Sequence, residues 1–114
     1  MQKHIRVTRE KGVWSVRAGG AVIAETENAL ELNEGDYDPV IYFPREDVAM
    51  ALLEKTNQKT NCAHKGEAIY FSIVTKSQVI ENAAWTYEAP RPELAHIANH
   101  MAFYRNDLVI VEEI

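Results

Sequence analysis

The sequence predicts a mainly β fold: a single domain of two curved antiparallel sheets, built like an open barrel or a sandwich, with one or two short helices. Short runs of β-branched and aromatic residues recur along the 114-residue chain, and clusters of Gly, Pro, Asn and Asp separate them. Only two segments carry helical signals. Because 46% of the residues are hydrophobic, a chain of this length can bury one core. We therefore expect one domain over residues 1–114.

The N-terminal quarter predicts a β-hairpin. Apolar and polar residues alternate over residues 13–18, two glycines that can adopt positive φ follow, and an apolar run occupies residues 21–25. An earlier strand is expected at residues 5–8. We expect it to pair with the first strand of the hairpin through a turn at residues 10–12.

The next part of the chain predicts one buried strand and a short helix at most. Residues 29–32 are too few for their periodicity to distinguish a strand from a helical turn. Turn formers fill residues 33–39, and a β-branched and aromatic strand is expected at residues 40–43. A proline opens residues 44–54, which suits a short helix. Residues 55–59 are polar and are expected to be exposed.

The C-terminal half predicts two hairpins. Residues 67–75 and 78–87 are expected to form the longest antiparallel pair of the protein. Prolines then interrupt the strand pattern, and residues 93–99 suit a short helix. Strands are expected at residues 101–104 and 108–111. A turn lies between them, so they are expected to form a C-terminal hairpin.

Charge and cysteine content favour a cytoplasmic protein. The formal net charge of -5 disfavours nucleic-acid binding, which depends on clustered Lys and Arg. No apolar run approaches the roughly 20 residues of a membrane-spanning helix, so no membrane is expected as a partner. A single cysteine cannot form an internal disulfide, and the first six residues lack the apolar run of a secretory signal.

Residues 60–66 gather reactive groups in one loop before a strand. Cys62 could be a nucleophile or a redox-sensitive thiol, because His64 and Lys65 nearby could favour the thiolate. The alternative is a thiol packed as a small hydrophobe. Lys65 could contact an anionic ligand, with Gly66 allowing the backbone to approach it, or it could be a surface lysine beside a turn.

Two further groups could complete a cleft. Arg45 could bind a carboxylate or phosphate through two hydrogen bonds, and Asp47 could orient it or act as a general base. Alternatively, both are structural charges at the start of a helix. Trp85 and Tyr87, two residues apart on a strand, could form an aromatic wall with Glu88 at its rim. Aromatic residues with this spacing also belong to protein cores.

A metal site is the least supported alternative. Its four possible ligands are Cys62, His64, His96 and His100. The last two are four residues apart, so a helix would place them on one face. The chain has no Cys-x-x-Cys pair, and we expect neither a bound metal nor another cofactor.

The segments at residues 42–48, 60–66, 84–88 and 102–104 resemble the recurring motifs of domain-of-unknown-function family 427. The resemblance extends from the glycine pair of the first hairpin to the last strand. It implies a small, mainly β fold described as a β-tent, which zinc-binding and ligand-binding relatives share. The family is catalogued as a nucleotidyltransferase domain. However, the chain lacks the Asp-x-Asp pair and the Gly-Ser loop that nucleotidyl transfer commonly uses.

These observations predict a cleft that binds a small polar or anionic ligand. Seven residues are expected to line it: Arg45, Asp47, Cys62, Lys65, Trp85, Tyr87 and Glu88. One alternative is an enzyme that uses Cys62 or a carboxylate such as Asp47 in catalysis. Another is a protein-interaction module in which the aromatic side chains form an exposed patch.

Overall fold

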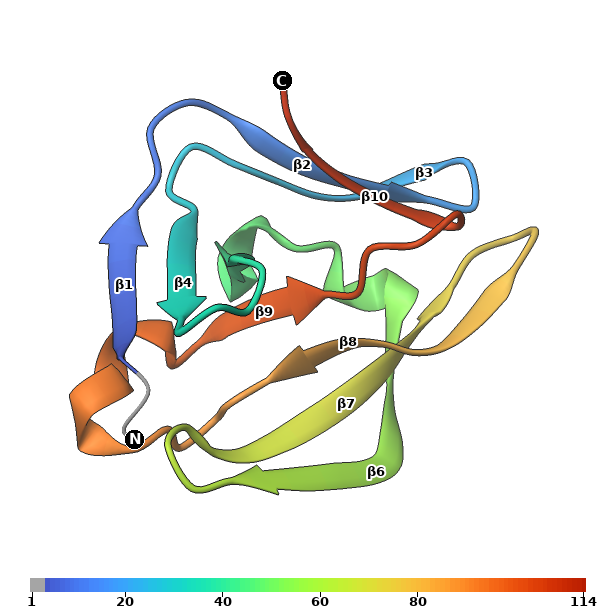
Figure 1. The fold of residues 1–114 in the computed structure, drawn as a ribbon. Helices are drawn as coiled ribbons and strands as arrows, with labels where there is room; N and C mark the ends of the chain where they lie inside the picture. Colours follow the sequence, from blue (N-terminus) through green and yellow to red (C-terminus); the bar gives the residue numbers. More distant parts are fainter. Residues whose placement is uncertain (1–3) are drawn as a thin grey trace.

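Two open antiparallel sheets make up the computed structural model, which describes residues 4–114 (Figure 1). Residues 1–3 lie outside the described part. The expectation that residues 1–6 form no secretory signal falls partly on them. The large sheet has seven strands, in the spatial order β1 (Ile5–Arg9), β4 (Leu30–Glu34), β5 (Val40–Pro44), β9 (His100–Phe103), β8 (Val79–Thr86), β7 (Gly66–Val74) and β6 (Leu53–Cys62). The mainly β prediction is confirmed.

The small sheet contains the predicted N-terminal hairpin. Its three strands are β10 (Val109–Glu113), β2 (Trp14–Ala18) and β3 (Ala21–Thr26). Gly19 and Gly20 form the turn with φ of +57° and +77°, the left-handed region that glycine adopts without steric cost. The Ser77 hydroxyl donates a hydrogen bond to the Gly19 carbonyl at 3.2 Å. The hairpin tip is therefore joined to the β7–β8 turn of the large sheet.

This contact distinguishes the two glycines. A Cβ at position 19 would lie 2.4 Å from Thr75 Oγ1, whereas one at position 20 would meet nothing within 4 Å. Each Gly→Ala change should cost roughly 1–2 kcal/mol for the left-handed backbone, and Gly19→Ala should cost more because Thr75 must move. Urea unfolding of both variants measures the difference. Equal losses would mean that the hairpin tip does not contact the large sheet.

Two predicted strand pairings are wrong. β1 pairs with β4 instead of β2, and β9 pairs with β5 and β8 instead of β10. Strand β10 pairs with β2 in the small sheet. The turn residues between two strands do not specify whether the strands form a hairpin or cross to different sheets. Val7 on β1 packs against the cluster that contains Tyr42, whereas Val16 on β2 packs in the cluster between the sheets.

The segment between β5 and β7 also differs from its prediction. Two 3₁₀ turns, η1 (Arg45–Asp47) and η2 (Met50–Leu52), replace a single short helix. The polar residues that follow lie on β6, an edge strand that no apolar pattern indicates because its side chains face solvent. The β6–β7 hairpin, with strands of 10 and 9 residues, is longer than the predicted β7–β8 pair.

The remaining expectations have different outcomes. Residues 30–32, in the segment for which strand and helical turn were both possible, lie on strand β4, and the expected strand at residues 40–43 is β5. A 3₁₀ segment, η3 (Pro92–Ile97), replaces the expected C-terminal helix.

The large sheet buries side chains on both faces. Along β5, β7 and β9, alternate residues point to opposite sides, as strand geometry requires. One side packs against the small sheet and forms the inter-sheet core, in which Phe43, Phe71 and Met101 are buried. We call the opposite side the tyrosine face. Its buried residues are Leu32, Tyr42, Ala68, Tyr70, Tyr87, Leu94, Ile97 and Ala102.

Candidate functional site

A pocket of about 180 Å³ opens on the tyrosine face, and we call it the aromatic pocket. Six of its lining residues are aromatic: Tyr37, Tyr42, Tyr70, Trp85, Tyr87 and Tyr104. Leu32 and Val40 add aliphatic surface. Its charged lining residues are Glu34, Asp38 and Lys65. The pocket therefore combines a mostly aromatic wall with a few charged groups, a composition typical of small-molecule sites.

Strand register places three of the aromatic side chains in one row. Tyr42 is opposite Ala102, Ala102 is opposite Trp85, and Trp85 is opposite Tyr70, so the row crosses four adjacent strands. The small side chain of Ala102 leaves space between its larger neighbours. Across this space, Trp85 Nε1 donates a hydrogen bond to Tyr42 Oη at 3.4 Å. The back wall of the pocket is thus fixed by the hydrogen-bonded sheet.

Two further contacts orient the aromatic side chains. Tyr70 Oη lies 3.0 Å from Thr60 Oγ1, within hydrogen-bond distance. The ring of Tyr104 lies 4.5 Å from that of Trp85, centroid to centroid, with an interplanar angle of 47°. These two rings meet at an angle and form a corner of the pocket.

An ion pair lies within the lining. Lys65 Nζ is 2.5 Å from Glu34 Oε1, and the side chains are only 14% and 11% exposed. Lys65 lies on the β6–β7 turn, where its carbonyl accepts a hydrogen bond from the Arg91 amide at 3.1 Å. Gly66 follows with a φ of +112°, which allows the chain to turn. Because the pair is shielded from water, the charge of Lys65 is compensated locally.

Three phenols of the pocket have raised pKa values. Burial raises the pKa of Tyr42, with an opposing contribution from the Trp85 hydrogen bond, and burial also raises the pKa of Tyr87. Burial and a hydrogen bond with Tyr70 raise the pKa of Tyr104 to about 12. These three hydroxyl groups are therefore uncharged at neutral pH.

Three of the seven predicted site residues, Lys65, Trp85 and Tyr87, line the aromatic pocket. Cys62 is a half-buried free thiol at the end of β6, outside the lining. Its carbonyl accepts a hydrogen bond from the amide of the lining residue Lys65 at 3.3 Å, so Cys62 lies close to the pocket.

The other three predicted residues lie elsewhere. Arg45 Nη1 is 3.4 Å from Glu88 Oε2, and its guanidinium lies 5.6 Å from the centroid of the Phe71 ring. Asp47 Oδ2 accepts a hydrogen bond from Thr26 Oγ1 at 2.7 Å, which joins η1 to β3. The expected Arg45 and Asp47 partnership is therefore replaced by separate structural contacts.

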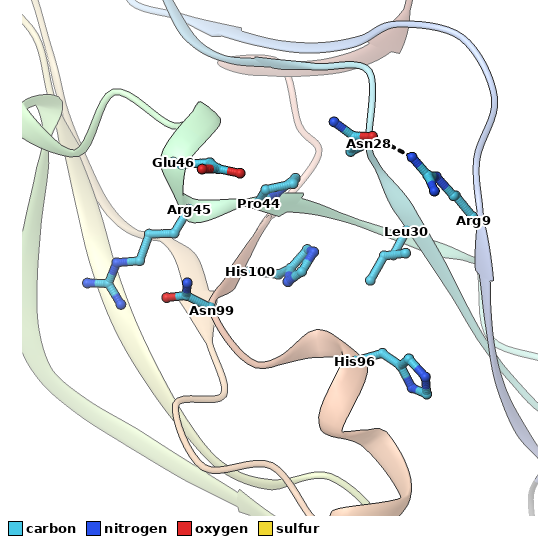
Figure 2. A pocket seen from close by; sticks show the side chains of 9 residues that line it. All are labelled: Arg9, Asn28, Leu30, Pro44, Arg45, Glu46, His96, Asn99 and His100. Atoms are coloured by element: carbon cyan, nitrogen blue, oxygen red, sulfur yellow. Dashed lines mark hydrogen bonds between the residues drawn. The ribbon is translucent and has the colours of Figure 1, made fainter.

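Arg45 lines a second pocket of about 390 Å³ together with Arg9, Glu46, His96 and His100 (Figure 2). In Figure 2 the Arg45 side chain extends away from His100. Arg9 Nη2 donates a hydrogen bond to Asn28 Oδ1 at 2.6 Å. These cations therefore do not converge on one point.

The four possible metal ligands do not come together, because His96 and His100 line the pocket beside Arg45 and His64 lines a different one. The expected helical face for His96 and His100 is wrong, because η3 ends at Ile97 and β9 begins at His100. His64 lines another pocket, beside Arg91 and Glu93. Within residues 4–114, no group of three or more His, Cys, Asp or Glu side chains is placed to hold a metal ion.

Sequence reasoning missed Tyr42, Glu34, Tyr37 and Asp38 as lining residues. The alternation of Tyr42 with Ile41 and Phe43 on β5 was a usable signal, because it places the tyrosine on the opposite face from its neighbours. Glu34 had no such signal, since it is 31 residues from Lys65 along the chain.

In the described part of the chain, no helix is long and apolar enough to span a membrane.

Family comparison agrees with the motifs. No curated protein matches the sequence. The model of the family described as domain of unknown function (DUF427) matches residues 6–113, which is nearly the whole chain. The predicted resemblance is confirmed, and the chain belongs to domain-of-unknown-function family 427.

Proposed function

We propose that this protein is a cytoplasmic binding domain that takes a small polar organic ligand into the aromatic pocket. The observation that carries the proposal is the convergence of six aromatic side chains and a shielded ion pair on one pocket. A mostly buried ion pair contributes little net stability compared with apolar packing, so its presence in a pocket favours a role in recognition.

The construction of the pocket supports binding. Tyr42, Tyr70 and Trp85 stand on strands β5, β7 and β8 of one hydrogen-bonded sheet, so little ordering is needed when a ligand binds. The pocket volume of about 180 Å³ is below the roughly 300 Å³ at which drug-sized sites begin. The ligand is therefore a small molecule with one ring or one head group.

Burial of the tyrosines disfavours the interaction-module alternative. Tyr42, Tyr70 and Tyr87 are each less than 10% exposed. A docking patch for a protein requires large aromatic side chains on the surface, and only Tyr37 and Tyr104 of the pocket are exposed. These five tyrosines form the walls and the rim of a concave site.

The enzyme alternative uses Cys62 or a carboxylate such as Asp47. Asp47 is bonded to Thr26 and lies outside the lining of the aromatic pocket, so Cys62 is the residue to test. The half-buried thiol lies close to the pocket but outside its lining. Alkylation of Cys62 that is fast at neutral pH and slowed by a pocket ligand would favour the enzyme. Slow alkylation that the ligand does not affect would favour binding alone.

A thermal-shift screen tests the binding proposal, with small amines, carboxylates, sugars and nucleosides as probes. A probe at 100 times its dissociation constant should stabilise the protein by about 2.7 kcal/mol. Tyr104→Ala should reduce the shift, because Tyr104 lines the pocket and its 45% exposure lets the fold tolerate the change. Arg45→Ala is the matched control outside the pocket. Loss of the shift in Arg45→Ala alone would place the site elsewhere.

A further inference from the structure

The charges of the aromatic pocket are not balanced. Lys65 is the only Lys, Arg or His in its described lining, and Glu34 holds its ammonium at 2.5 Å. Asp38 is the third charged lining residue, is exposed and forms no ion pair within residues 4–114. The described lining therefore carries a net negative charge, in a protein whose formal net charge is -5.

The aromatic lining also favours positive charge. The faces of Trp and Tyr rings carry partial negative charge and attract ammonium groups, most strongly where water is excluded. The tilted rings of Trp85 and Tyr104 form a corner, and Tyr42 and Tyr70 continue the wall along the sheet. A cation in the pocket would contact several rings at once.

Among the lining residues that the structure describes, an anionic ligand finds no free cation. It would face Asp38 and the aromatic rings, and it could reach the ammonium of Lys65 only by competing with Glu34. Like charges across a site lower affinity for the wrong ligand. In the sequence, Lys65 indicated an anionic ligand. Its pairing with Glu34 in the structure favours a cationic ligand instead.

We infer that the ligand of the aromatic pocket is a free small molecule with a positively charged head group, an ammonium or trimethylammonium. The inference rests on the proposed binding function and specifies its ligand class. The aromatic rings contact the head group, and Asp38 compensates its charge at the rim. The small volume accepts a head group and excludes a large organic ligand.

Calorimetric titration with choline tests this inference. The matched probe is its neutral isostere, in which carbon replaces the quaternary nitrogen. Choline should bind on the order of tenfold more tightly than the isostere, because the two differ in charge and hardly in shape. Asp38→Asn should weaken choline binding several-fold, and its exposed position preserves the fold. Arg45→Ala should leave choline binding unchanged.

The affinity of Lys65→Met for choline tests whether the pocket prefers a cation or an anion. The variant releases the Glu34 carboxylate, so choline should bind more tightly, whereas an anion would bind less tightly. Weaker choline binding by Lys65→Met, equal binding of the isostere, or no choline binding would each overturn the inference. If Lys65→Met does not fold, Asp38→Asn decides: unchanged choline affinity overturns the inference.

Two further comparisons distinguish a free cationic ligand from a lipid surface, and the ligand class from the binding function itself. Phosphatidylcholine vesicles present the same head group on a lipid surface, and cosedimentation with them without binding of free choline would overturn the small-molecule ligand. If choline fails but a neutral or anionic probe gives a Tyr104-dependent thermal shift, the inference fails and the binding function stands. If no probe of any class binds, both fail.

Discussion

Lys65→Met should lower the free energy of unfolding by about 3 kcal/mol, because it leaves the carboxylate of Glu34 shielded and unpaired. The estimate follows from the low exposure of both side chains, 14% for Lys65 and 11% for Glu34. Exposed ion pairs contribute about 1 kcal/mol or less, so the magnitude distinguishes a shielded pair from a solvated one. Urea unfolding at neutral pH measures it.

A double-mutant cycle provides the control for this result. Glu34→Gln removes the charge that Lys65→Met leaves unpaired, so the double variant should be more stable than Lys65→Met alone. Additive losses would show that the two side chains do not interact. A loss below about 1 kcal/mol for Lys65→Met would show that water reaches the pair.

Phe43→Ala should cost about 3–5 kcal/mol, the typical loss for a buried phenylalanine. Phe43 is fully buried in the inter-sheet core, and its ring meets Phe103 edge to face with centroids 5.8 Å apart. The change removes this contact and leaves a cavity between the sheets. Chemical denaturation measures the loss.

The adjacent residue gives a matched comparison. Tyr42→Phe keeps the ring on the tyrosine face but removes the acceptor of the Trp85 Nε1 hydrogen bond. It should cost only about 0.5–1.5 kcal/mol, because most of the buried area is retained. A loss as large as that for Phe43→Ala would contradict the assignment of a single hydrogen bond to the Tyr42 hydroxyl.

Local patterns explain which parts of the fold could be predicted. Alternation and a glycine turn predicted the β2–β3 hairpin, because both its strands and its turn lie in one short stretch. The pairing of β1 with β4 joins Ile5 to Glu34, and no local pattern specifies such a distant partner. Strand β6 carried no signal because its polar side chains face water on an edge.

The site was predictable to the same degree. Period-two spacing placed Trp85 and Tyr87 on one face, and both line the pocket. The row that joins Trp85 to Tyr42 and Tyr70 depends on the register of β5, β9, β8 and β7, which only the folded sheet determines. Lys65 was identified as a site residue, but its partner Glu34 changes what it can bind.

Fluorescence of Trp85 tests most directly whether the aromatic pocket is a binding site. The other tryptophan, Trp14, lies on β2 in the small sheet, and its buried Nε1 has no hydrogen-bond partner among the described residues. Trp14→Phe removes this unsatisfied donor and makes Trp85 the only tryptophan. Titration of this variant with choline should change the Trp85 emission saturably, and Asp38→Asn should shift the midpoint to higher choline concentration. Calorimetric binding of choline without any change in Trp85 emission would place the ligand outside the pocket and contradict the account.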